Sequence, residues 1–106
     1  MKTVDYDFDY SEEKNQLLKE TRGVSFEDII EALSKKGLLD DIEHFNKQLY
    51  SRQRIFVVRC KSYVYAVPYI IDKRKKLIFL KTIYPSRALK SKYIKKWIKT
   101  LFIYHW

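Results

Sequence analysis

The sequence predicts an α+β protein in which two N-terminal helices and a C-terminal helix pack on an antiparallel β-sheet. The chain has 106 residues, 46% of them hydrophobic, which suits one core in a single domain over residues 1–106. Apolar side chains follow helical spacing over residues 12–37 and then alternate with a period of two as far as residue 84. The predicted element order is β-α-α-β-β-β-β-α, and the short connections between its later strands indicate an antiparallel meander.

The first two elements are a short strand and a capped helix. Residues 3–8 alternate, which places Val4, Tyr6 and Phe8 on one face of a strand. A helix follows, because a capping residue precedes two glutamates and a glycine ends the apolar spacing. Its expected cap, buried side chains and end are Asp9 or Ser11, Leu17 and Leu18, and Gly23.

The second helix begins at a capping box. Ser25 is followed three residues later by Asp28, so each side chain can accept a hydrogen bond from the other residue's backbone N–H. Apolar residues then recur at helical spacing, and a glycine is expected to end the helix. The apolar residues are Phe26, Ile29, Ile30 and Leu33, and the glycine is Gly37.

Four strands are expected in the period-two region. A tight turn near Ser62 joins the second to the third, and the polar stretch 72–76 joins the third to the fourth. Pro68 has no backbone N–H, so its strand should be exposed or bulged on that side. The four strands cover residues 38–42, 55–61, 63–71 and 77–84.

The last helix is expected at about residues 86–104, with Ser86 as its N-cap. One face is apolar and the other is rich in lysine, so the apolar stripe should pack on the sheet or on a second copy of the chain. The alternative is a membrane-surface helix, because an amphipathic helix with terminal aromatic residues also suits a lipid interface. The stripe consists of Leu89, Tyr93, Ile94, Trp97, Ile98, Leu101 and Phe102.

Acidic side chains are concentrated in the first half of the chain and basic side chains in the second half. Residues 1–50 carry seven basic and twelve acidic side chains, whereas residues 51–106 carry fifteen basic side chains and one acid, Asp72. The whole chain has a net charge of +9. A one-sided basic surface indicates a polyanionic partner, and nucleic acid is the commonest one. The alternative is a solvated lysine-rich surface that has no partner.

Several classes of function lack their signatures. Cys60 is the single cysteine, so the chain has no internal disulfide, and a cytoplasmic location is expected. No stretch is apolar for long enough to span a membrane, and no glycine-rich phosphate loop occurs. His44 and His105 stand far apart, and no Cys/His spacing suits zinc. No metal or other cofactor is therefore expected.

Three segments resemble the BrnT-type toxins of bacterial toxin–antitoxin systems, whose fold is similar to that of the RelE-like ribonucleases. The segments are Phe8-Asp-Tyr-Ser-Glu-Glu-Lys14-Asn15, Gly23-Val-Ser-Phe-Glu-Asp28 and Lys81-Thr-Ile-Tyr-Pro-Ser-Arg-Ala88. The resemblance covers about residues 6–93, and Arg22 stands where the family pattern has histidine. It implies an endoribonuclease, acting on free or ribosome-bound messenger RNA, that arrests translation. It also implies a cognate antitoxin protein as partner, in a hetero-oligomer, with a homodimer as the other assembly left open.

Metal-independent RNA cleavage needs a group to take the proton of the 2′-hydroxyl and cations to stabilise the charge on phosphorus. Suitable side chains cluster in sequence at the end of the fourth strand. We predict Arg87 as the phosphate clamp, Lys81 as an electrostatic aid, and Tyr84 as a base or stacking platform. We expect the basic side chains of the second half to form one concave patch there. The predicted substrate-binding residues are Ser86, Lys90, Tyr93, Arg54 and Arg59.

Each of these residues also has an ordinary structural interpretation. Lys81 suits a solvated strand position, Tyr84 a core position and Arg87 an exposed first helical turn. A non-catalytic nucleic-acid-binding module is therefore the rival function. In that case the basic strands and three tyrosines would hold RNA or DNA by phosphate contacts and stacking. These tyrosines are Tyr63, Tyr65 and Tyr69.

Overall fold

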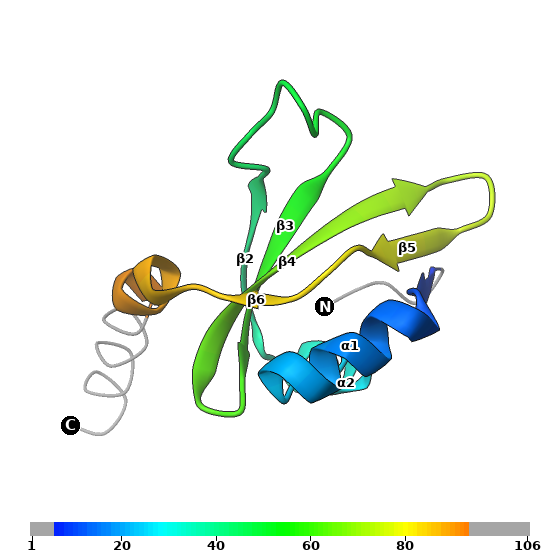
Figure 1. The fold of residues 1–106 in the computed structure, drawn as a ribbon. Helices are drawn as coiled ribbons and strands as arrows, with labels where there is room; N and C mark the ends of the chain where they lie inside the picture. The colour runs from blue at the N-terminus through cyan, green and yellow to red at the C-terminus, as the bar shows by residue number, and fades with distance from the viewer. Residues whose placement is uncertain (1–5, 94–106) are drawn as a thin grey trace.

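The computed structural model describes residues 6–93 and confirms the α+β class (Figure 1). The two N-terminal helices lie together on one side of a six-stranded sheet, and a further helix follows the last strand. The elements are β1 (Asp7–Asp9), α1 (Glu12–Arg22), α2 (Phe26–Ser34), β2 (Leu38–Glu43), β3 (Arg54–Cys60), β4 (Tyr63–Asp72), β5 (Leu77–Leu80), β6 (Tyr84–Pro85) and the helical residues 87–93.

The sheet is mixed, whereas the sequence predicted an antiparallel one. Its strand order is β1-β5-β4-β3-β2, and β6 pairs with β4. All neighbours from β2 onward are antiparallel, as their short connections predict, but β1 runs parallel to β5. Both helices and three strands separate β1 from β5 in sequence, so no turn length fixes their relative direction.

The cap of α1 forms as predicted, and one buried residue was predicted wrongly. The Ser11 hydroxyl accepts a hydrogen bond from the Lys14 backbone N–H, and Gly23 ends the helix in the left-handed conformation with φ 66°. Leu18 is buried, but Leu17 is 51% exposed. Consecutive helical residues point about 100° apart, and only the Leu18 side of α1 faces the core.

A buried asparagine joins α1 to the start of α2. The Asn15 amide donates to Glu27 Oε1 at 2.7 Å, and its oxygen accepts from the Phe26 backbone N–H at 2.7 Å. The predicted capping box is present, with Ser25 and Asp28 each accepting from the other's backbone N–H. These polar contacts fix the angle at which the two helices meet.

The second helix ends at Ser34, earlier than the predicted stop at Gly37. Gly37 has a different role, because a Cβ built there would lie 2.6 Å from the Ala32 carbonyl oxygen and 2.8 Å from that of Arg59. The missing side chain therefore lets the end of α2 approach β3 closely.

Each face of the sheet has its own apolar cluster. The helix side is the larger, and the opposite face is covered in part by residues 87–93. Leu89 and Tyr93 are buried there, so the described start of the apolar stripe packs on the sheet. The rest of the predicted stripe, from Ile94 to Phe102, lies outside the described residues, as do Val4 and His105. Among residues 6–93 we find no helix with the length and apolar character needed to cross a bilayer.

The predicted fourth strand is divided in two. β5 ends at Leu80, and residues 81–83 lead to the two-residue β6. The Pro68 carbonyl accepts from the Lys81 backbone N–H at 2.8 Å, but Pro68 has no N–H to donate in return. The ladder is interrupted at this point, on the side of Pro68 where the sequence predicted that the strand would be exposed or bulged, although Pro68 itself is buried.

Candidate nucleic-acid interface

The tip of the β3–β4 hairpin carries a lysine that reaches back to the helices. Lys61 and Ser62 both have positive φ, 51° and 63°, as a two-residue hairpin turn requires. Lys61 Nζ lies 3.1 Å from the Gly23 carbonyl oxygen and 3.1 Å from Asp28 Oδ2. The hairpin tip is thereby joined to the α1–α2 junction.

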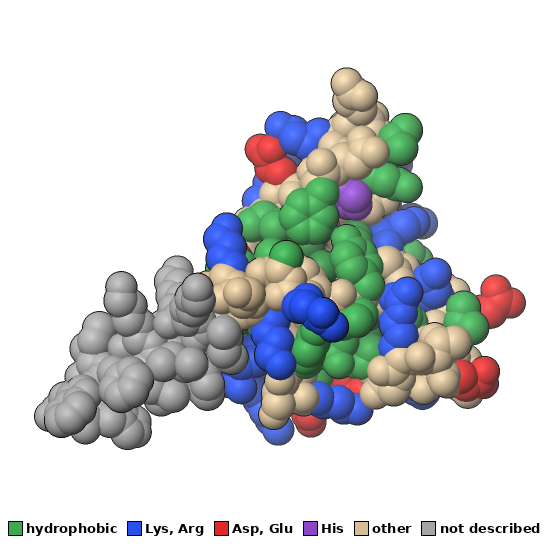
Figure 2. All heavy atoms as spheres, turned by 60° about the vertical axis from the view of Figure 1, so that its left-hand side comes forward, with side chains coloured by type: hydrophobic (Ala, Val, Ile, Leu, Met, Phe, Trp, Pro, Cys, Tyr) green, Lys and Arg blue, Asp and Glu red, His purple; other side chains and the backbone are tan. Residues whose placement is uncertain are grey.

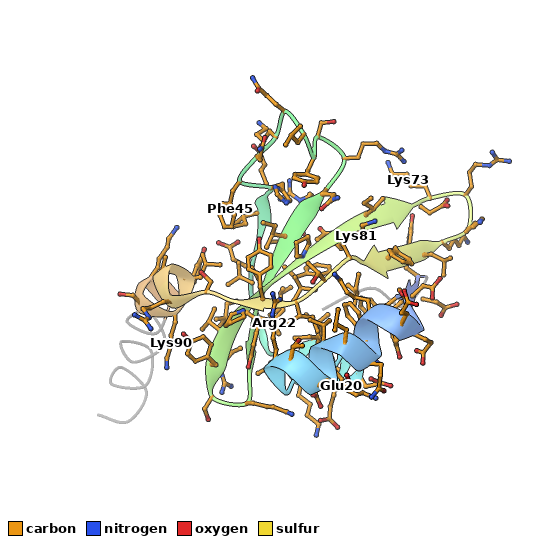
Figure 3. The ribbon with its side chains drawn as sticks, in the orientation of Figure 1. Glu20, Arg22, Phe45, Lys73, Lys81 and Lys90 are labelled. Atoms are coloured by element: carbon orange, nitrogen blue, oxygen red, sulfur yellow. The ribbon has the colours of Figure 1, made fainter. Side chains whose placement is uncertain are left out.

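The same junction contributes an arginine to the segment that joins β5 to β6. Arg22, the last residue of α1, donates from its guanidinium to the Ile83 carbonyl oxygen. Lys81 is two residues before Ile83, so their Cα atoms are at most about 7 Å apart. Figure 3 shows Arg22 and Lys81 along this part of the chain. Residues 81–83 therefore carry one basic residue, Lys81, and are contacted by a second, Arg22, from a distant part of the sequence.

A third group of contacts extends this arrangement to the start of the last helix. The Ser86 N–H donates to the Val64 carbonyl at 3.1 Å, and the Ser86 hydroxyl accepts from the Leu89 N–H as the predicted cap. One turn later, Lys90 Nζ lies 4.3 Å from the centroid of the Tyr63 ring, a cation–π contact. Arg87 lies between them on the exposed first turn, and within residues 6–93 it makes no ion pair.

We call this arrangement the cationic surface. Its parts are joined by the contacts just described, which run from α1 through the β3–β4 hairpin to residues 81–90. Asp28 is the acid that contacts it directly, through Lys61, and that contact raises the pKa of the lysine. The cationic surface consists of Arg22, Lys61, Lys81, Arg87 and Lys90, with the ring of Tyr63.

The groove nearest the end of β5 is not purely cationic. It has a volume of about 940 Å³, and its walls hold two lysines and two glutamates around the apolar side chains of Leu17 and Phe79. Lys81 lines it with its Nζ 5.4 Å from the Phe79 ring centroid, but Tyr84 and Arg87 do not line it. The lining residues are Ser11, Glu13, Lys14, Gln16, Leu17, Glu20, Phe79 and Lys81.

The single concave patch of basic side chains predicted from the sequence is therefore wrong in form. Figure 2 shows Lys and Arg side chains spaced over the visible face, with hydrophobic side chains exposed between them. The reason is the break in the ladder after Leu80, because β6 pairs with β4 further along, at Tyr65 and Ala66, and Tyr84 and Arg87 therefore lie outside the groove. The cationic surface is spread over the end of α1, the β3–β4 hairpin tip and residues 81–90, and of its residues only Lys81 lines the groove at the end of β5.

Tyr84 and Tyr93 both lie in the apolar cluster that faces away from α1 and α2. Tyr84, on β6, pairs with Ala66 of β4 and is partly buried. This burial raises the pKa of the Tyr84 hydroxyl. Tyr93 is 5% exposed, and its hydroxyl donates to Asp40 Oδ2 at 2.5 Å. Burial, followed by this contact with Asp40, raises the pKa of Tyr93 to about 12. The assignment of Tyr93 to substrate binding is wrong, because its side chain belongs to the core.

Arg54 belongs to a separate structural cluster on β2, β3 and β4. Its Nε donates to Asp41 Oδ1 at 3.1 Å, and the Tyr69 hydroxyl donates to the same carboxylate at 2.7 Å. The Tyr69 ring is 3% exposed and stacks on Phe56 with centroids 3.8 Å apart. Tyr69 therefore cannot stack on a base, which corrects that part of the rival interpretation. Arg59 lies at a smaller groove beside the end of α2, where its N–H donates to the Gly37 carbonyl.

Sequence reasoning missed Arg22 and Lys61 as parts of the surface. Arg22 stands at a position that the family resemblance singles out, so a signal for it was available. Lys61 is placed by a hairpin turn whose partner, the α1–α2 junction, is 38 residues away from it at Gly23. Among residues 6–93, no group of three or more His, Cys, Asp or Glu side chains is placed to hold a metal ion.

Comparisons with known proteins add no relative to this description. No protein-family model matches the chain, and neither the curated proteins nor the solved structures contain a match.

Proposed function

We propose that this protein acts on RNA as the toxin component of a toxin–antitoxin system, cleaving messenger RNA without a metal and inhibiting translation. The observation that carries the RNA part of the proposal is the cationic surface. Arg22 reaches residues 81–90 from the end of α1, Lys81 and Lys90 lie within that segment, and Lys90 lies over the ring of Tyr63. Cations interleaved with an aromatic ring suit a phosphate backbone whose bases stack.

The toxin part of the proposal rests on the sequence resemblance to BrnT-type toxins. The element order is compatible with it, since a strand and two helices precede the strands of the meander. A cognate antitoxin is the protein partner that follows from this proposal, and a cytoplasmic location is the setting in which messenger RNA is met.

Cleavage would use Arg87 as the phosphate clamp. Its guanidinium is exposed beside Lys90, so it can approach a phosphate and donate two hydrogen bonds to it. Lys81 would add positive potential from the β5–β6 connection. Tyr84 suits a proton-accepting role poorly, because burial raises its pKa away from neutrality.

The burial of Tyr84 favours a second candidate, a module that binds RNA without cleaving it. Both candidates need the same cations, but only the ribonuclease produces new RNA ends. The rate of cleavage and the affinity for RNA must therefore be measured separately.

The test compares wild type with Arg87→Ala on messenger RNA, with and without ribosomes, by mapping new 5′ ends. Arg74→Ala is the matched control, because Arg74 is an exposed arginine on the β4–β5 turn. We expect cleavage by wild type and by Arg74→Ala, and its loss in Arg87→Ala. If none of the three cleaves but all bind RNA with a steep dependence on salt, the binding module is correct. If wild type neither cleaves nor binds RNA, both candidates fail.

A further inference from the structure

We propose that the β2–β3 loop is a second RNA-contact site, at which exposed aromatic rings stack on an unpaired base. This inference rests on the proposed function and extends it to a part of the molecule outside the cationic surface. The rings belong to His44, Phe45 and Tyr50, which we call the aromatic platform.

The platform exposes apolar surface that the fold does not cover. Phe45 is 63% exposed and Tyr50 is 42% exposed, and the neighbouring Leu49 is 72% exposed. These are three of the five large hydrophobic side chains exposed in the described part of the chain. Clustered exposed apolar side chains generally mark an interaction site, whereas scattered ones do not.

The loop is held in one conformation by its own hydrogen bonds. The Asn46 N–H donates to His44 Nδ1 at 3.0 Å, and the Asn46 side chain accepts from the Leu49 N–H at 3.2 Å. The Tyr50 N–H donates to the Asn46 carbonyl at 3.0 Å, which closes the turn. The His44 ring then lies 4.5 Å from Tyr50 and 6.4 Å from Phe45, centroid to centroid. Rings fixed in this way lose little conformational entropy when a ligand stacks on them.

The charges around the platform suit a polyanion. Lys47, Arg52 and Arg54 lie on or beside the loop, and the acids Asp41 and Glu43 lie at the end of β2. Lys47 pairs with Glu43 at 2.6 Å and Arg54 with Asp41 at 3.1 Å, whereas Arg52 is exposed and makes no ion pair within residues 6–93. Exposed rings flanked by cations form the usual contact for single-stranded nucleic acid, where phosphates meet the cations and bases meet the rings.

The register of the sheet places the platform within reach of the cationic surface. Glu43 pairs with Arg54, Arg54 with Tyr69, and Tyr69 with Leu80, so these four residues form one row across the sheet. Three strand spacings separate the ends of this row, or about 14 Å. β2 and β5 run in opposite directions, so the chain leaves Glu43 and Leu80 on opposite sides of this row, and the start of the loop and Lys81 each lie one residue from it. A short single strand can therefore contact both sites.

The test measures binding of a fluorescent single-stranded oligoribonucleotide by the full chain at several salt concentrations. Removing one stacked ring in Phe45→Ala should weaken binding by about 5- to 150-fold. The slope of affinity against salt should not change, because no phosphate contact is lost. Phe45→Trp should bind as wild type does. Leu49→Ala is the comparison without a ring: Leu49 is 72% exposed in the same loop, and its removal should weaken binding much less than Phe45→Ala does.

A base analogue reports on stacking directly. With 2-aminopurine in the oligonucleotide, fluorescence should be quenched by wild type and remain high with Phe45→Ala. The inference is overturned if Phe45→Ala binds and quenches as wild type does while Arg87→Ala binds more weakly, and the proposed function then stands. It is also overturned if Leu49→Ala weakens RNA binding as much as Phe45→Ala, which would show an apolar contact that does not depend on ring stacking. If wild type does not bind RNA at all, the proposed function and this inference fail together.

Discussion

Arg22 donates a hydrogen bond from the end of α1 to the main-chain carbonyl of Ile83, 61 residues later. This contact fixes the chain between β5 and β6, where no regular ladder holds it. The position of Lys81 beside it, and the direction in which the chain enters the last helix, therefore depend on the α1–α2 junction. Arg22 therefore contributes both to the stability of this segment and to the position of a cation in the proposed RNA-binding surface.

Replacing Arg22 should loosen residues 81–85 without unfolding the protein. Arg22→Ala removes a charge-assisted hydrogen bond, so we expect a loss of about 1.5 kcal/mol in the free energy of unfolding. Hydrogen exchange should speed up at residues 81–85 more than in β3. Lys19→Ala, on the same helix, is the control and should change neither. Equal exchange in Arg22→Ala and wild type would show that the contact is not needed for order there.

Asn15 should be sensitive even to a small change, because it is buried in α1 and both hydrogen bonds of its amide go to the first residues of α2. Asn15→Ala leaves the Phe26 N–H without its acceptor, which should cost about 2–3 kcal/mol. Asn15→Asp should be worse, because it places a second carboxylate against Glu27. Urea unfolding monitored by circular dichroism measures both, with exposed Gln16→Ala as the control. A loss below about 0.5 kcal/mol for Asn15→Ala would contradict this account.

The two glycines should differ in their response to alanine for different physical reasons. Gly23→Ala meets no atom within 4 Å but retains a positive φ, so the expected loss is about 1 kcal/mol. Gly37→Ala forces a methyl group against two main-chain oxygens that cannot rotate away, and we expect about 3 kcal/mol. Thermal unfolding of the two variants gives the order. The reverse order would mean that the end of α2 moves easily away from β3.

Stability should fall on the alkaline side because of Tyr93. Its pKa is raised from 10.0 to about 12 in the folded protein, so the folded state holds a proton that the unfolded state releases. The stabilisation is therefore complete below about pH 10 and is lost as the pH rises from about 10 to about 12. Urea unfolding between pH 8 and pH 11 measures the slope, which Tyr93→Phe should reduce. An unchanged slope in Tyr93→Phe would assign the effect to other tyrosines, such as Tyr69, whose pKa burial also raises.

Local signals in the sequence predicted local structure well. The Ser11 and Ser25 caps, the Gly23 helix end and the turn at Ser62 each depend on residues within a few positions of one another. An irregularity beside Pro68 was also expected, because a missing N–H is visible in the sequence, but the division of the predicted strand 77–84 into β5 and β6 was not.

Features that depend on distant pairing were not predicted. The parallel direction of β1, the contact between Tyr93 and Asp40, and the stack of Tyr69 on Phe56 join parts of the chain whose register the sequence does not state. The predicted grouping of the candidate site residues failed for the same reason. Lys81, Tyr84 and Arg87 are close in sequence, but the ladder with β4 is interrupted between β5 and β6, so the groove keeps only Lys81.

The strand order also rearranges the charge asymmetry of the chain. Both outermost strands, β1 and β2, come from the acidic half, and they carry Asp7 and Asp9 on one side and Asp40, Asp41 and Glu43 on the other. The inner strands β3, β4 and β5 come from the basic half. Carboxylates on an edge strand repel the same edge strand of a neighbouring molecule, which discourages edge-to-edge pairing of copies into fibres. A crowded solution of this protein should therefore resist aggregation through its sheet margins.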